Sequence, residues 1–429
     1  MEMSSFRLIS SFGRVPSLGS TISKKFISTG PAIRPFLLGP LSRNASRLTT
    51  KSKLFLPFMK QQGLRHTMTA APPPNVSMPL SRNMERLIGG WLAGCAGMCF
   101  GAVVLGGVTR LTESGLSMVH WKLFGERPPT SMDEWQLEFE RYKQFPEFKI
   151  KNKDITLDEF RWIWYMEYGH RTWGRAIGAV FYIPAAIFWM KGHFSPLMKK
   201  RTVFLGGLLA FQGLLGWYMV KSGLESRFHG ESDVPRVSQY RLAAHLGSAF
   251  VLYSYLLWCS LDYLLPVQQL QRSKELLRFK RLAHMCKGLV FITAISGAFV
   301  AGLDAGLVYN SFPKMGDKWI PDDVLEYKPT WTNFTENPTT VQFDHRILGV
   351  TTFSTIMACW AISRRLNIPR RARLACNVMA IAALAQVGLG ISTLLTYVPT
   401  PLAASHQSGS LILLSIAFWL THELKRIPK

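Results

Sequence analysis

The sequence predicts an all-α polytopic membrane protein whose eight transmembrane helices form two tandem four-helix bundles related by an internal repeat. Three observations predict this fold. Apolar residues make up 48% of the 429 residues and come in long blocks with few charges. Each block is long enough to cross roughly 30 Å of hydrocarbon as a helix. Basic residues gather after alternate blocks, and short motifs recur in the same order in both halves of the chain.

Eight blocks of suitable length follow one another, and an even number of crossings places both ends on one side of the membrane. They divide into an N-terminal bundle, residues 85–265, and a C-terminal bundle, residues 280–424. We expect the spans at residues 88–109, 172–190, 202–220, 242–264, 285–306, 346–363, 374–396 and 402–421.

The net charge of +24 reports topology and not a nucleic-acid partner. Between residues 110 and 171, ten Lys and Arg are balanced by eleven Asp and Glu. The basic segments instead follow every second span, as expected for loops that face the positive-inside compartment. These segments are residues 191–201, 271–281, 363–373 and 425–429.

Residues 1–80 have the composition of a mitochondrial presequence followed by a linker. The first 65 residues hold eleven Lys or Arg, eleven Ser and a single acid, Glu2, without a long apolar core. Such a segment is typical of a transit peptide. We therefore expect a multi-pass protein of the mitochondrial inner membrane, in contact with its lipid, with both mature termini in the matrix. The six cysteines lie in or at the ends of apolar spans without a CxxC pair, which favours buried, inert thiols.

Four anchors relate the second half of the membrane region to the first, and they fall at equivalent ends of the spans. Each half holds an even number of spans, so the two halves run through the membrane in the same direction. The anchor pairs are "TESGL" (112–116) with "LDAGL" (303–307), "EYGHRTWG" (167–174) with "QFDHRILG" (342–349), "QGLLGW" (212–217) with "QVGLGI" (386–391), and "AAHLGS" (243–248) with "ASHQSG" (404–409).

Four histidines, His170, His245, His345 and His406, occupy these anchors at the beginnings of the even-numbered spans, so we expect them at one depth, toward the intermembrane space. Two histidines on parallel helices can hold a flat macrocycle between them, one imidazole on each side of a haem iron. A zinc site fits poorly, because no Cys, Asp or Glu recurs beside each pair. A single histidine at a helix end is more often interfacial, but four at repeated positions favour ligation.

Four arginines near the anchors, Arg171, Arg175, Arg241 and Arg346, are candidate partners for haem propionates, since guanidinium pairs well with carboxylate. Snorkelling of these side chains to lipid headgroups explains their positions equally well.

Small residues near the anchors, Gly106, Gly107, Gly213 and Gly388, are expected to allow close approach of a backbone or a porphyrin face, although helix packing explains them as well.

The chain resembles the haem A synthase family over nearly everything from residue 85 to residue 425. The segments that carry the resemblance are "GGVTRLTESGLSMV" (106–119), "YMEYGHR" (165–171), "FQGLLGWYMVKSGL" (211–224), "YRLAAHLGSA" (240–249), "GLDAGLVYNSFPKMG" (302–316), "VQFDHRILG" (341–349) and "PTPLAASHQSGS" (399–410).

The resemblance implies an oxidoreductase that converts a methyl group of haem O to the formyl group of haem A, by successive hydroxylation and loss of water. It further implies that His170 and His245 receive haem O, while His345 and His406 hold a haem b cofactor. A matrix ferredoxin is the expected electron donor. Haem O synthase, cytochrome c oxidase assembly factors and a second copy of the chain are further expected partners.

Glu167 is the candidate catalytic residue, because Gln342 stands at the matching position of the second repeat. A reacting site needs a proton carrier, whereas a site that relays electrons does not. Capping of backbone amides at a helix start is the alternative role for this acid. A dihaem b-type electron carrier is the main alternative function, and a transporter built from parallel repeats is a third.

Overall fold

The computed structural model describes residues 80–122, 124–224, 236–266 and 268–426. Apart from its last residue, the predicted presequence and linker, residues 1–80, lies outside this part of the chain. Within the described ranges the structure contains helices and no β-strand. The all-α class is therefore confirmed.

The long helices are α1 (Arg82–Leu111), α4 (Leu157–Met190), α5 (Pro196–Gly223), α6 (Gln239–Leu264), α7 (Lys274–Gly302), α9 (Pro338–Ser363), α10 (Arg370–Leu395) and α11 (Thr400–Glu423). The short elements are α2 (Met132–Lys143), α3 (Pro146–Ile150), η1 (Ala305–Leu307), η2 (Thr330–Thr332) and α8 (Asn333–Glu336).

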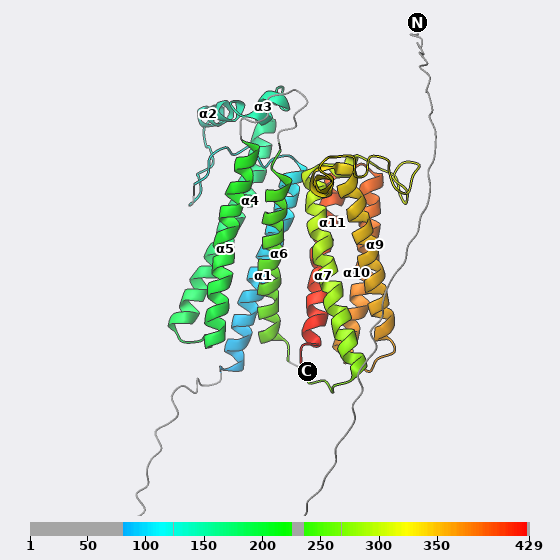
Figure 1. Ribbon diagram of the computed structural model, residues 1–429. Coiled ribbons are helices and arrows are strands. Elements are labelled where there is room, and N and C mark those ends of the chain that lie inside the picture. The colour runs from blue at the N-terminus through cyan, green and yellow to red at the C-terminus, as the bar shows by residue number, and fades with distance from the viewer. Residues whose placement is uncertain (1–79, 123, 225–235, 267, 427–429) are drawn as a thin grey trace, which may run out of the picture. The chain divides into compact units, whose positions relative to one another are not determined.

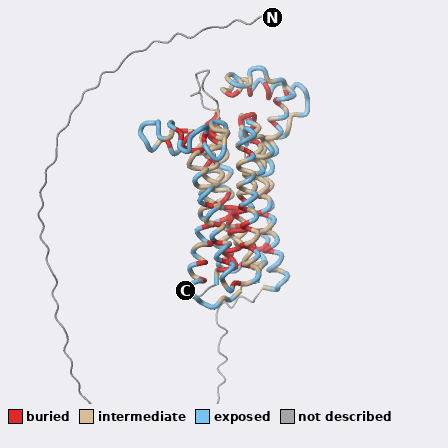
Figure 2. Tube along the Cα trace, turned by 90° about the vertical axis from the view of Figure 1, so that its right-hand side faces the viewer, coloured by how far each residue is buried: buried red, intermediate tan, exposed pale blue. Residues whose placement is uncertain are grey.

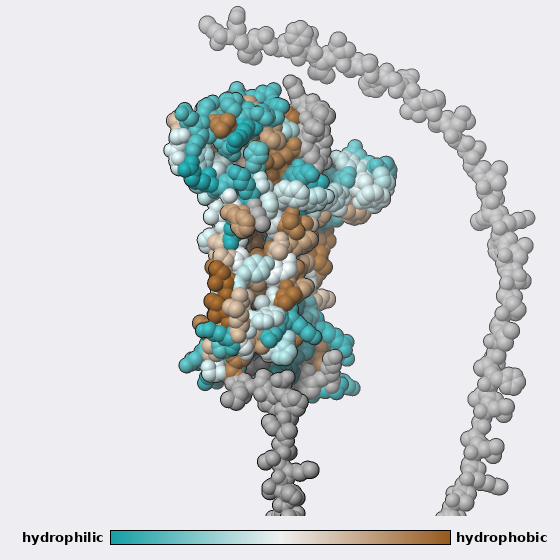
Figure 3. All heavy atoms as spheres, turned by 90° about the vertical axis from the view of Figure 1, so that its left-hand side faces the viewer, coloured by the Kyte–Doolittle hydropathy of each residue, from teal (hydrophilic) through white to brown (hydrophobic). Residues whose placement is uncertain are grey.

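Seven of these helices, all the long ones except α11, are long and apolar enough to cross a membrane. The first half of α11 carries Ser405, His406, Gln407, Ser408 and Ser410, and these polar side chains lower its mean hydropathy. A band of apolar side chains surrounds the middle of the helices and hydrophilic side chains gather at both ends, as Figure 3 shows for one face. A multi-pass membrane protein is confirmed, and the eighth crossing stays a prediction.

Helix α4 begins at Leu157, well before residue 172, where the sequence placed the start of the span. The side chain of Thr156 accepts from the backbone of Glu159, whose carboxylate returns the interaction in a capping box. The charged residues between 157 and 171 mark where α4 leaves the apolar layer, but the helix itself continues beyond that layer to Leu157. His170 consequently lies within a helix and not at its start, which corrects the prediction from sequence.

Four helices, α1, α6, α7 and α11, form the centre of the bundle (Figure 1). Helix α1 packs on α4 and α6, and α5 packs on α6. In the second half, α7 packs on α9 and α11, and α10 packs on the same two helices. The halves meet where α6 contacts α7 and where α1 contacts α11. Buried residues concentrate between these helices, as Figure 2 shows.

A cap formed by α2, α3 and the first turns of α4 covers one end of the first half (Figure 1). Its core is a cluster of buried side chains, mostly aromatic, that includes Trp135, Tyr142, Phe160 and Trp164. Met118, from the segment after α1, is buried in the same cluster. The cap therefore holds the segment after α1 against the start of α4.

The opposite end of the bundle carries the basic loops and a network of charges. Asp262 at the end of α6 accepts from Arg201 on α5 at 2.8 Å and pairs with Lys425 after α11. The buried His422 lies 3.1 Å from the same carboxylate. This network ties the first half to the end of the second.

Candidate functional site

Each of the four predicted histidines packs the edge of its ring against a glycine on a neighbouring long helix. A methyl group added to any of these glycines would lie about 3 Å from the ring carbon Cε1, below the usual separation of two carbon atoms. At Gly106 and Gly390 the histidine ring would have to move, whereas at Gly216 and Gly297 a shift of a few tenths of an ångström would relieve the contact. The pairs, with that distance, are Gly106 with His170 (2.8 Å), Gly216 with His245 (3.3 Å), Gly297 with His345 (3.2 Å) and Gly390 with His406 (2.8 Å).

The rings of His345 on α9 and His406 on α11 lie close together in a T-shaped arrangement. Their centroids are 6.4 Å apart and their planes are inclined at 82°. An iron bound by two imidazole nitrogens at about 2 Å each places the ring centroids roughly 6 Å apart. The separation of this pair therefore fits a metal held between the two rings.

The Nδ1 atoms of this second pair have polar neighbours. Nδ1 of His345 lies 2.7 Å from the hydroxyl of Ser296, which donates its own proton to the Thr293 carbonyl at 2.8 Å. The amide nitrogen of Gln386 lies 3.2 Å from Nδ1 of His406 and donates to the His406 carbonyl at 2.8 Å. Both rings are fixed from the side away from Nε2.

The first pair consists of His170 on α4 and His245 on α6. Within the described part of the chain, both Nδ1 atoms are buried without a hydrogen-bond partner. Gln212, which matches Gln386 in the repeat, instead donates to Ser248 at 2.6 Å. The two histidine pairs thus differ in what surrounds their rings.

Glu167 forms a buried ion pair with Arg171 one helical turn later, at 2.6 Å. The same guanidinium donates to the backbone carbonyls of Met118 at 2.9 Å and His120 at 2.7 Å. The arginine therefore clamps the segment after α1 onto α4, and all three of its nitrogens have partners within the chain.

The second half repeats this clamp with a neutral partner. Arg346 donates to the side-chain oxygen of Gln342 and to the Tyr309 carbonyl, both at 3.0 Å. Gln342 in turn donates to the Ala305 carbonyl at 2.7 Å. The two halves therefore build the same clamp, and only the first contains a carboxylate.

The remaining candidate arginines contact the chain near the ends of α1 and α5. Arg175 donates to the Lys122 carbonyl at 3.0 Å. Arg241 donates to the Tyr218 carbonyl at 2.9 Å and lies 3.8 Å above the centroid of the Tyr218 ring. Binding of haem propionates by any of the four arginines stays a prediction.

The glycines that contact the histidines differ in part from those that the sequence singled out. A methyl group at Gly213 or Gly388 would meet nothing within 4 Å, whereas Gly216 and Gly390 contact histidines. Aligning "QGLLGW" with "QVGLGI" shows that Gly216 and Gly390 are the glycines shared by both repeats. This shared position is the sequence signal that identifies the two glycines in contact with histidines.

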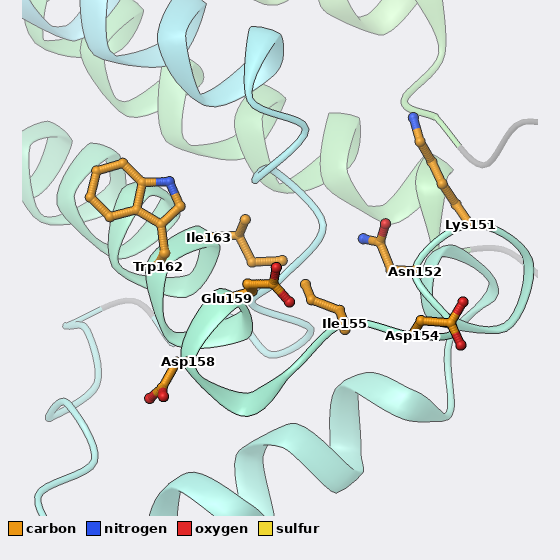
Figure 4. A pocket seen from close by; sticks show the side chains of 8 residues that line it. All are labelled: Lys151, Asn152, Asp154, Ile155, Asp158, Glu159, Trp162 and Ile163. Carbon is orange, nitrogen blue, oxygen red and sulfur yellow. The ribbon is translucent and has the colours of Figure 1, made fainter.

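A separate pocket of about 660 Å³ opens where the segment after α3 meets the start of α4 (Figure 4). Its lining includes Lys151, Asn152, Asp158, Glu159 and Trp162. None of the four histidines lines it, so the candidate site rests on the histidine pairs.

Comparison with known proteins decides the family. The family model described as cytochrome oxidase assembly protein, COX15-CtaA, matches residues 89–418. The chain belongs to this family. It is 62% identical to human haem A synthase COX15 over 82% of the chain and 86% of that protein. It is 46% identical to Arabidopsis thaliana haem A synthase COX15 over 85% of the chain and 78% of that protein.

A bacterial relative, the haem A synthase of Nitrosospira multiformis, is 46% identical over 80% of the chain and 95% of its own length. The relatives therefore include eukaryotic and bacterial members of the COX15-CtaA family, and the match takes in all four histidines. The family inferred from the sequence motifs is confirmed.

Proposed function

We propose that this chain is a haem A synthase, an oxidoreductase of the mitochondrial inner membrane that converts haem O to haem A. The observation that carries the proposal is the close pair His345 and His406, with ring centroids 6.4 Å apart. Membership of the COX15-CtaA family and 62% identity to human haem A synthase support the activity.

His345 and His406 would hold a resident haem b, and His170 and His245 would receive haem O. Imidazole is the usual protein ligand for such an iron, and a porphyrin supplies the other four nitrogens itself. The glycine beside each ring leaves room for the imidazole against the neighbouring helix. When bound, the resident haem supplies one-electron redox chemistry.

Glu167 is the proposed proton carrier in the first site. Its carboxylate is almost fully buried and one helical turn from His170, on the same helix. General acid or base catalysis needs such a group beside the reacting atoms. Gln342 at the matching position cannot carry a proton, which suits a site that only relays electrons. A purely structural role, holding Arg171, is the competing assignment.

A tandem repeat of two four-helix bundles, divided near residues 265–280, is the proposed architecture. Its supports are the four histidine–glycine contacts, each made to the preceding long helix. Glu113 and Asp304, at matching positions, also share a left-handed backbone conformation with φ of 54° and 52°. Helix α11 would then be the eighth crossing, and its polar first half would face the haem site.

The proposed orientation places both mature termini in the matrix and the histidine pairs toward the intermembrane space. The basic loops that join α4 to α5, α6 to α7 and α9 to α10 support it, because they lie at the end of the bundle away from the cap (Figure 1). A matrix ferredoxin as electron donor, contacts with haem O synthase and assembly factors, and self-association belong to the same proposal.

Purified protein reconstituted in lipid with haem O, a chemical reductant and dissolved oxygen as the oxidant tests the activity. Chromatography of the extracted pigments should reveal the alcohol and then the formyl product. A dihaem electron carrier, the less favoured alternative, would show bound haem and no modified pigment. Bound haem that is reduced and reoxidised repeatedly without any alcohol or formyl product would refute the synthase.

A further inference from the structure

The hydroxyl of Ser296 lies 2.7 Å from Nδ1 of His345 and 2.8 Å from the Thr293 carbonyl. An imidazole that binds a metal through the lone pair of Nε2 carries its proton on Nδ1. A serine oxygen can accept a hydrogen bond from that Nδ1–H while its own hydroxyl donates to a carbonyl. The two contacts of Ser296 therefore suit the metal-binding form of His345.

The first half has no counterpart of this hydroxyl. Aligning "TESGL" with "LDAGL" places Leu105 opposite Ser296 and, one residue on, Gly106 opposite Gly297. The glycines confirm the register, because each packs against the histidine of its own half. A leucine side chain offers no acceptor, and among the described residues Nδ1 of His170 is buried without a hydrogen-bond partner.

The second histidine of each pair also has different neighbours in the two halves. The amide nitrogen of Gln386 lies 3.2 Å from Nδ1 of His406 and helps to hold the ring, but as a donor it cannot accept a hydrogen bond from Nδ1–H as Ser296 can. In the first half, Gln212 instead donates to the hydroxyl of Ser248. The position that matches Ser248 in the second half is Gly409, which has no hydroxyl to bind Gln386. A polar neighbour therefore lies at Nδ1 of His406 in the second half, whereas the matching glutamine of the first half binds elsewhere.

Hydrogen bonds to the outer nitrogen of a ligating histidine orient the ring and raise its basicity, and their loss typically weakens metal binding about 10- to 100-fold. A resident cofactor needs strong ligands, whereas a substrate must enter and its product must leave. A haem bound by two histidines also has no coordination position left for another ligand unless one histidine can leave.

We propose that Ser296 is a positioning residue that makes His345 a permanent iron ligand, and that Leu105 at the matching place makes His170 a releasable one. This inference rests on the proposed function, because it takes the second pair as the resident site and the first as the substrate site. It assigns the difference between the two sites to a single side chain beside each histidine.

Release of haem to an excess of apomyoglobin tests the proposal on full-length protein in detergent. Chromatography separates haem b from haem O and haem A, so the pigment that leaves identifies the site it left. Ser296→Ala should speed the release of haem b about 10- to 100-fold and shift its midpoint potential upward. Ser296→Thr, which keeps the hydroxyl, should restore both values.

Leu105→Ser is the reciprocal variant, and it should slow the release of haem O and haem A while leaving haem b unchanged. The proposal is overturned if Ser296→Ala releases haem b at the rate of the unaltered chain with the same potential. It is also overturned if Ser296→Thr behaves like Ser296→Ala, since the effect would then be one of packing. Failure of the unaltered chain to bind haem b or to oxidise haem O would instead refute the proposed function.

Discussion

Replacing Glu167 with Gln gives the first half the clamp that the second half already has. Gln342 accepts from Arg346 at 3.0 Å, so an amide at residue 167 can accept from Arg171 in the same way. The change removes the charge from a hydrogen bond of 2.6 Å in which both side chains are at least nine-tenths buried. A hydrogen bond to a charged group contributes about 1.5–3 kcal/mol, and the amide retains part of it.

The expected loss of activity is larger than this change in stability. Removal of a positioned proton carrier typically slows a reaction by about 10²–10⁴-fold, which corresponds to roughly 3–5 kcal/mol in the barrier. Glu167→Gln should therefore bind both haems and form little product. Single-turnover conversion of haem O, followed by chromatography, measures the rate, and thermal unfolding of the same samples measures stability.

Arg171→Lys is the control for a structural role, because it loosens the clamp on Met118 and His120 but keeps the carboxylate and a positive charge. If this variant is as slow as Glu167→Gln, the acid acts by holding the arginine. Full activity of Glu167→Gln would remove the carboxylate from the mechanism altogether.

Three further predictions follow from single contacts. Gly390→Ala should lose haem b, because the added carbon would lie 2.8 Å from Cε1 of His406. Gly388→Ala should retain haem b, because the added carbon would have no neighbour within 4 Å among the described residues. The haem-to-protein ratio of the purified variants measures the difference. Burial raises the pKa of Glu147 in the cap to about 8, so the folded cap keeps a proton that the unfolded segment releases near 4.5. This stabilisation is complete below pH 4.5 and is lost as the pH rises through 8. Hydrogen exchange of cap amides, corrected for its intrinsic pH dependence, should rise over that range, and Glu147→Gln should flatten the rise. Asp262→Asn should lower the thermal unfolding temperature in lipid by several degrees, since it leaves the cations around this carboxylate without their shared partner.

The sequence predicted the long helices and singled out the four histidines, because both can be recognised from sequence patterns alone. Long apolar blocks determine membrane helices, and repeated motifs mark positions that two halves use in the same way. The start of α4 was misplaced because a hydropathy pattern detects the apolar layer, while the helix continues into the cap through the capping box at Thr156.

The surroundings of the histidines could not be predicted, because they depend on contacts between helices. Ser296 is an ordinary serine within an apolar span, and only the packing of α7 against α9 brings its hydroxyl to His345. The partners of Arg171 could not be predicted from sequence either, because Met118 and His120 lie in a segment whose position depends on the cap.

The two halves share the residues that set the geometry around the histidines and differ in residues that would affect the chemistry there. The histidines, the glycines behind them and the arginine clamps are shared. Three differences lie beside the shared frame: Glu167 against Gln342, Leu105 against Ser296, and Ser248 against Gly409. Each alters either a proton carrier or a hydrogen bond to a ring. A carrier that passes electrons between two equivalent haems has no use for such differences, whereas an enzyme with one reacting and one resident haem needs its two sites to differ in these respects.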